Sequence, residues 1–277
     1  MTSVMKQTLA LVLATFGLAA CRDTVVGPRP DRRPLAPSFD VAPTAADPLA
    51  TASAEGVVLP NAYSNVMGEG WNTFPHANSN MRYQQVFLGS ELGGLSSVSG
   101  LCLRRDQFFG GPAGTQQLTV KLGPTQLDHT TLTPVFDANY SATPTTVFSG
   151  DVNIPAADTL GGGTPDDFYI CIEFTTLYLH PPGSNVIVEI VNTSSTRFSN
   201  YADACQGGAG CTTSRVWAVS ATATAGNTDR FYGLIMKFIR RGDPTTKDEC
   251  KDNGWEKFGF KNQGECVSFV ETGKDRR

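Results

Sequence analysis

Short runs in which apolar and polar residues alternate are the feature that most limits what this chain can fold into. At 118–122, three aliphatic residues (Leu118, Val120 and Leu122) alternate with polar ones. A period of two places the apolar side chains on one face of a β-strand. Similar short apolar runs lie at 83–88, 96–104, 145–150, 168–174, 185–191, 213–220 and 232–238. They predict a fold built from short strands.

Turn-forming residues separate these runs, and no long stretch between 57 and 239 has a helical period. About eight to ten short strands in this length predict an all-β fold, an antiparallel β-sandwich or jelly roll. A segment of this length can bury a full core as one domain, 57–239. It carries 8 basic and 13 acidic residues, so no nucleic-acid-binding surface is expected.

The N-terminal segment has the composition of an export signal. Lys6 precedes an apolar run over 9–20 that contains no acidic residue. That run is shorter than the roughly 20 residues that a membrane-spanning helix needs. Leu18-Ala19-Ala20-Cys21 resembles the lipobox at which bacterial lipoprotein signal peptides are cut. The resemblance implies that the signal peptide, 1–20, is removed and that Cys21 is acylated and inserts its chains into a lipid bilayer.

The alternative is cleavage by the ordinary signal peptidase after Gly17-Leu18-Ala19. The residue after Cys21 is Arg22 and not Asp. In the sorting pattern of lipoproteins in two-membrane bacteria, this favours the outer membrane over the inner one. Residues 21–56 hold six prolines and only isolated hydrophobic residues, which predicts a disordered tether. We therefore expect an exported protein of the cell envelope, with its domain in the periplasm or on the cell surface.

Besides Cys21, six cysteines remain in the mature chain, and an exported protein keeps disulfides. The spacing favours two short-range pairs, which leave the third pair by elimination. Both members of that third pair lie on the polar face of an alternating strand, so their strands, 98–104 and 168–174, are predicted to be adjacent. Their Cα atoms must then lie within about 7 Å. The expected pairs are Cys205–Cys211, Cys250–Cys266 and Cys102–Cys171.

Residues 240–277 differ in character, with 9 basic and 8 acidic residues in 38 positions. Thr246-Lys247-Asp248-Glu249 fits a capping box, and Asn253-Gly254 is a stop signal after a short helix. A second helix is predicted to start at 262–265 and to end at Gly273. Aromatic residues between the helices supply a minimal core, which a disulfide would stabilise. These aromatic residues are Trp255, Phe258 and Phe260.

Two resemblances extend this interpretation. The body resembles exported bacterial β-sandwich proteins of uncharacterised function, on the motifs at 72–75, 81–87, 97–104, 118–122, 166–168 and 185–190. Many such proteins carry C-terminal sorting tails, whereas this chain lacks a hydrophobic C-terminal helix. The motifs Cys250–Trp255, Phe260–Gly264 and Cys266-Val267 resemble a short module on bacterial exported proteins. Neither resemblance implies an activity.

Signals of catalysis are weak. There is no Gly-x-Ser-x-Gly elbow, and His76, His129 and His180 lie in turn-like sequences that predict surface loops. Asp166-Asp167 is a pair of carboxylates, but its position after a glycine run favours a polar turn. No enzyme is predicted, and a secreted hydrolase is the less favoured alternative. No cofactor or metal ligand set is predicted, with structural calcium in the loops as the alternative.

Aromatic and amide side chains on loops point to ligand binding, because such residues commonly face sugars. One such segment lies at 71–80, and Tyr201 lies beside the expected Cys205–Cys211 loop. The alternative for Trp71 and Phe74 is that they close the end of the sandwich. We expect a non-catalytic binding or interaction module for polysaccharide or an envelope protein, with a purely structural component as the alternative. The candidate ligand-binding residues are Trp71, Phe74, His76, Asn78, Asn80 and Tyr201.

Overall fold

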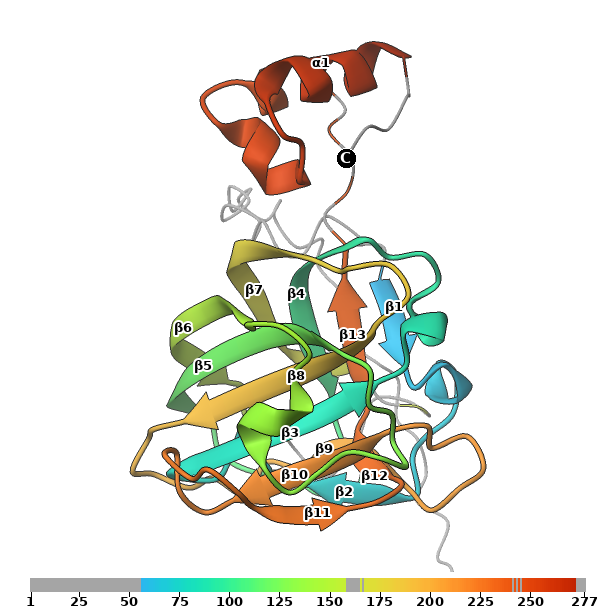
Figure 1. Ribbon diagram of the computed structural model, residues 1–277. Helices are drawn as coiled ribbons and strands as arrows, with labels where there is room; N and C mark the ends of the chain where they lie inside the picture. The colour runs from blue at the N-terminus through green and yellow to red at the C-terminus, as the bar shows by residue number, and fades with distance from the viewer. Residues whose placement is uncertain are drawn as a thin grey trace, which may run out of the picture. The chain divides into compact units, whose positions relative to one another are not determined.

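The computed structural model describes residues 56–157, 165, 167–240, 242, 244 and 246–272 (Figure 1). The predicted signal peptide, Cys21 and all of the predicted tether before residue 56 lie outside these residues. Thirteen strands, five 3₁₀-helices and a single α-helix make up the described part, which confirms the all-β fold class. Within it, no helix is long and apolar enough to cross a membrane.

Three antiparallel sheets form the body. The four-stranded sheet has the order β1 (Gly56–Leu59), β13 (Met236–Ile239), β4 (Ser97–Arg104) and β7 (Phe168–Leu179). The six-stranded sheet has the order β11 (Asn227–Asp229), β10 (Ser214–Ala218), β3 (Met81–Phe87), β8 (Asn185–Asn192), β5 (Gly114–Thr125) and β6 (Thr145–Ile154). The three-stranded sheet has the order β12 (Tyr232–Leu234), β9 (Ala202–Gln206) and β2 (Gly70–Asn72).

The two larger sheets form two layers that enclose the main core (Figure 1). The aliphatic residues of the 118–122 run are buried in it, as their alternation predicts. Across the layers, the ring of Phe87 on β3 meets that of Phe238 on β13 edge to face, with 5.4 Å between ring centroids. Burial of such rings is a main source of stability in a sandwich of this kind.

The strands are more numerous than the sequence predicts. The four additional ones, β1, β2, β9 and β11, span three to five residues each, which is too short for an alternating pattern to stand out. The run at 232–238 is also divided at Ile235. Its first part pairs with β9 and its second part pairs with β1 and β4, because the chain passes from one sheet into another.

A second apolar cluster covers the outer face of the six-stranded sheet. There Val86, Ile187 and Val216 pack against Leu132 and Phe136. Phe136 begins the short helix η3 (Phe136–Asn139) in the segment between β5 and β6. Since both faces of β8 are covered, its sequence from Val186 to Val191 is apolar apart from Glu189 and does not alternate.

The structure contains three disulfides, and they join the expected cysteine pairs. Cys102 on β4 lies directly opposite Cys171 on β7, with 4.0 Å between Cα atoms. This confirms that the two strands are adjacent. The Cys205–Cys211 bond closes a loop after β9. Disulfides of this number indicate an oxidising environment of the kind that exported proteins occupy.

The C-terminal module has its own small core around the Cys250–Cys266 disulfide and Phe260. The capping box forms, since the Thr246 amide donates to Glu249 Oε2 at 2.8 Å. The helix after it is shorter than expected, a single 3₁₀ turn, η4 (Asp248–Cys250), followed by η5 (Gly254–Phe258). Helix α1 (Gln263–Thr272) follows Asn262, whose Oδ1 accepts the Glu265 amide at 2.9 Å. The predicted stop, Gly273, lies outside the described residues.

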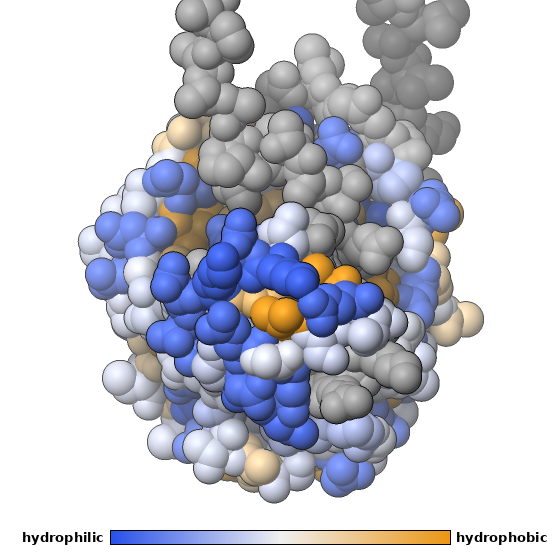
Figure 2. All heavy atoms as spheres, turned by 90° about the horizontal axis from the view of Figure 1, so that it is seen from above, coloured by the Kyte–Doolittle hydropathy of each residue, from blue (hydrophilic) through white to orange (hydrophobic). Residues whose placement is uncertain are grey.

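Exposed apolar surface is limited. Figure 2 shows a face on which hydrophilic residues surround one small hydrophobic area. Isolated apolar side chains on a surface are normal, whereas grouped ones mark interaction sites. The exposed large hydrophobic residues of the described chain are Val66, Trp71, Phe108, Val135, Leu179, Val219 and Phe231. Trp71 and Phe231 both line one pocket, described next.

Candidate functional site

A hollow of about 630 Å³ lies where the edge of the six-stranded sheet meets the three-stranded sheet. This volume falls within the range of roughly 300–1,000 Å³ found for small-molecule sites. We call the hollow the aromatic pocket, because three aromatic rings stand in its wall. Its lining residues are Gly70, Trp71, Gln206, Gly207, Arg215, Asp229, Arg230, Phe231 and Tyr232.

An ion pair and a stacked ring build one side of the aromatic pocket. Arg215 on β10 lies opposite Asp229 on β11, and its Nε and Nη2 atoms both lie 2.8 Å from Asp229 Oδ2. The same carboxylate oxygen accepts Trp217 Nε1 at 2.9 Å. The Arg215 guanidinium lies 3.9 Å from the centroid of the Tyr232 ring. Such cation–π contacts fix both groups in place.

Tyr232 is fixed at its other end as well. Its hydroxyl donates to the carbonyl oxygen of Trp71 at 2.7 Å. Trp71 is the middle residue of β2, where it pairs with Asp203 of β9. The buried Asp203 accepts Arg104 Nε at 2.9 Å and the Gly68 amide at 3.0 Å. The backbone that carries Trp71 is therefore held from both sides, while its side chain stays 46% exposed.

Phe231 has an unfavourable backbone conformation, with φ of 52°. The left-handed region costs an L-residue with a side chain about 1–2 kcal/mol. Neighbouring groups hold it there: the Phe231 amide donates to Ser214 Oγ at 2.9 Å, and Gly207 donates to the Phe231 carbonyl at 2.8 Å. Its ring packs on His129 and is 41% exposed. Residues held in such conformations are concentrated at ligand sites.

A row of rings leads away from the aromatic pocket. The Trp71 and Phe109 ring centroids are 4.9 Å apart, and those of Phe109 and Tyr201 are 4.8 Å apart. We call Trp71, Phe109 and Tyr201 the aromatic strip. Phe108, next in the chain, is 62% exposed. Because Trp71 belongs to both the strip and the pocket, the two form one continuous surface.

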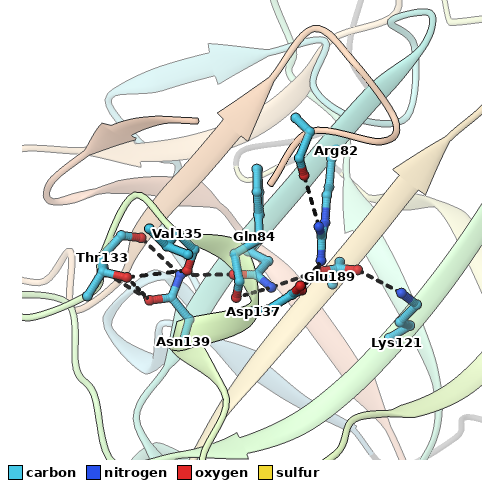
Figure 3. Close-up of polar contacts among 10 residues, drawn as sticks. Arg82, Gln84, Lys121, Thr133, Val135, Asp137, Asn139 and Glu189 are labelled. Carbon is cyan, nitrogen blue, oxygen red and sulfur yellow. Dashed lines mark hydrogen bonds and ion pairs between the residues drawn. The ribbon is translucent and has the colours of Figure 1, made fainter. Parts of the chain in front are cut away.

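A second group of polar residues lies on the outer face of the six-stranded sheet (Figure 3). Glu189 on β8 is 0% exposed. Its Oε1 lies 3.0 Å from Lys121 Nζ, and its Oε2 lies 2.9 Å from Arg82 Nη2 and 2.6 Å from Gln84 Nε2. Asp137 also contacts Arg82 Nη2, at 2.6 Å. Hollows of about 320 and 420 Å³ border this group, which we call the charge cluster.

The charge cluster connects a covering segment to the sheet. Asn139 Nδ2 donates to Gln84 Oε1 at 3.0 Å and to the Thr133 carbonyl at 2.9 Å (Figure 3). Burial lowers the pKa of Arg82, but hydrogen bonds to Glu189 and Asp137 outweigh this and the pKa lies above its usual value. Both Glu189 oxygens are occupied by donors, so the fold itself supplies the partners of this buried carboxylate.

A scan against protein-family models and searches of curated proteins and of solved structures find no match to this chain. The resemblances drawn from the sequence therefore stay predictions.

Of the six candidate residues, the structure places Trp71 and Tyr201 in the aromatic strip and the other four outside it. Trp71 and Tyr201 come together through Phe109, although 130 positions separate them in the chain. Phe74 instead is half-buried and packs on Trp217, with 4.9 Å between ring centroids, and the Arg215 guanidinium lies 5.6 Å from the Phe74 ring centroid. Asn80 is exposed, with φ of 45°, and its Oδ1 accepts the Ala221 amide at 3.2 Å.

The prediction that the histidines lie on surface loops is wrong for His76. Its side chain is fully buried, and Asn78 is buried as well, because residues 75–78 face inward. Asn192 Nδ2 donates to the carbonyls of Pro75 and Asn78 and secures this segment. Burial lowers the pKa of His76 to about 4, against the raising effect of the Asn200 carbonyl 3.2 Å from Nε2.

Most residues of the aromatic pocket, and Phe109 of the aromatic strip, are missing from the sequence-based candidates. Phe109 lies in a polar loop beside another phenylalanine, a signal that could have drawn attention to it. Arg215 and Trp217 share one face of a predicted strand, which places them together. Asp229 and Tyr232 gave no such signal, because their roles depend on pairing with β10 and β9. Of the other carboxylate pair considered, Asp166 lies outside the described residues.

Metal binding finds no support in the described ranges. No group of three or more His, Cys, Asp or Glu side chains is placed there to hold a metal ion.

Proposed function

We propose that this chain is a non-catalytic glycan-binding protein of the bacterial cell envelope, and that the aromatic pocket and the aromatic strip form its binding surface. The exposed ring of Trp71, shared by pocket and strip, carries this proposal. A continuous surface of this kind suits a chain of linked sugars better than a single compact metabolite.

The chemistry of the aromatic pocket matches that of a sugar. The C–H groups on one face of a sugar ring carry slight positive charge, and an aromatic face carries negative charge, so the two attract. The hydroxyl groups need hydrogen-bonding partners, which Gln206 and the partly exposed Asp229 carboxylate offer at the pocket. A mainly apolar ligand would leave these polar groups without partners, at a cost in free energy.

An envelope protein is the other partner class, since Trp, Tyr and Arg also dominate protein interfaces. A stable protein interface buries about 800 Å² on each side and is not usually built around an open hollow. The hollow favours the glycan.

Membrane attachment completes the proposal. Acylated Cys21 would anchor the chain, with the outer membrane favoured by Arg22. The proline-rich 21–56 segment would act as a spacer that reaches on the order of 100 Å when extended. Such a spacer would let the domain search for glycan away from the bilayer surface.

The test is glycan-array binding of the full chain to envelope and extracellular polysaccharides, followed by calorimetry on the best ligand. Trp71→Ala should lower the affinity about 30-fold, the effect of removing a central aromatic contact worth about 2 kcal/mol.

Leu179→Ala is the matched control for Trp71→Ala. Leu179 is also an exposed apolar residue, at the end of β7 that pairs with Ser97. The other end of β7 is the one near the strip, where the Tyr169 hydroxyl donates to the Tyr201 carbonyl at 3.3 Å. The control should bind like the wild type. Equal losses in both variants, or no binding to any glycan, would contradict the proposal.

A further inference from the structure

The charged residues that line the aromatic pocket do not cancel. Asp229 is the only carboxylate in its lining, and Arg215 already pairs with it. Arg230 is a second cation in the lining and is exposed to solvent. Its Nη1 donates to the His129 carbonyl at 3.3 Å, and no carboxylate of the described chain pairs with it.

This cation belongs to an acidic protein. The chain has a net charge of −4, and the 57–239 segment has fewer basic than acidic residues. Arg82, Arg104 and Arg215 each form an ion pair with a carboxylate. An arginine left without one beside a pocket attracts an anion and can bind a carboxylate through two parallel hydrogen bonds.

The backbone beside Arg230 is also fixed. The next residue, Phe231, is held in its unfavourable conformation by Ser214, whose Oγ donates in turn to the His129 carbonyl at 2.6 Å. Arg230 Nη1 contacts that same carbonyl. The fold thus presents a cation and an aromatic ring from neighbouring positions of one rigid turn.

A uronic acid satisfies both groups at once. It keeps the C–H face of the sugar ring and carries a carboxylate on the carbon next to the ring oxygen. A simple anion lacks the face for stacking, and a neutral sugar lacks the charge. Resting on the proposed function, we infer that the glycan bound at the aromatic pocket contains uronic acid and that Arg230 binds its carboxylate.

The test compares short oligomers of galacturonate, glucuronate and mannuronate with their methyl esters, by calorimetry on the full chain. Esterification removes the charge and leaves the sugar backbone unchanged. At least one free acid should bind about 10-fold more tightly than its ester at low salt. The preference should shrink as sodium chloride is raised, because salt screens exposed charges.

Arg230→Gln should remove this preference, with the ester bound as before. Lys261→Gln is the matched control, since it removes one exposed positive charge from the C-terminal module, and it should keep the preference. Equal binding of every acid and ester, with both weakened by Trp71→Ala, would overturn the role of uronic acid and leave glycan binding intact. Absence of binding to these oligomers and to all neutral glycans would overturn both.

Discussion

The six-stranded sheet carries two arginine–carboxylate pairs, and their surroundings differ. In the charge cluster, Glu189 is shared by two cations, Arg82 and Lys121, and η3 lies in the segment that covers it (Figure 3). At the edge of the same sheet, Asp229 pairs with Arg215 beside an open hollow. Hollows border both pairs. The carboxylate of the first pair is 0% exposed and has two cationic partners, whereas the second pair has exposed aromatic rings and a further cation next to it.

This difference separates a structural role from a binding role. A buried group with all its partners supplied by the fold has nothing left to offer a ligand. At the aromatic pocket, the rings of Trp71 and Phe231 remain exposed and Arg230 remains without a carboxylate. Free surface of this kind is what a ligand would cover.

The largest expected effect is on stability at the charge cluster. Glu189→Ala leaves Arg82 and Lys121 without their shared carboxylate and should lower the free energy of unfolding by about 3–5 kcal/mol. Urea unfolding followed by fluorescence measures this. Asp137→Asn alters a largely exposed partner of Arg82 and should cost less than about 1 kcal/mol. If both variants lowered the free energy of unfolding by the same amount, the shared carboxylate of Glu189 would not be the main source of stability in the charge cluster.

Acid should act on the buried His76. His76 has a pKa of about 4 in the folded chain and about 6.5 when unfolded, so below pH 6.5 the unfolded chain binds more protons. The stability that neutral His76 contributes is fully present above pH 6.5 and is lost as the pH falls. The loss amounts to about 3 kcal/mol at pH 4. His76→Gln should flatten this part of the stability profile. Identical profiles for wild type and variant would show that His76 is not the group that titrates.

A smaller effect tests whether the strained turn serves binding at the expense of stability. Phe231→Gly relieves the left-handed conformation but loses the ring contact with His129, so stability should change by less than about 1 kcal/mol. Phe231→Ala loses the ring and keeps the strain, and should be about 1 kcal/mol less stable than the glycine variant. Both should bind glycan more weakly. Full affinity in either variant would remove Phe231 from the binding surface.

Local patterns in the sequence account for much of the fold. Period-two runs locate the longer strands, and the polar positions of Cys102 and Cys171 indicate that their strands are neighbours. The second helix is predicted at its observed start because Asn262 is a capping residue. These features depend on a few consecutive residues, so they can be recognised without the tertiary structure.

The candidate site depends on long-range pairing, which local patterns do not contain. Trp71 and Tyr201 could be selected by residue type, but the row that joins them requires Phe109 from a third segment. His76 was expected on the surface because its neighbours are typical of turns. Turn-forming residues predict where the backbone bends, but they do not predict which side chains of the segment are buried in the core.

The pairing of β1 with β13 has a mechanical consequence. Gly56, where the described chain begins, lies opposite Ile239, and Leu59 lies opposite Met236. Tyr232 of the aromatic pocket precedes β13 in the chain, so it is connected to the Met236 end of this strand. A pull between an anchor on the N-terminal side and a bound glycan would therefore run along the two strands. The load would be shared by their hydrogen bonds simultaneously, in shear, instead of opening them one after another.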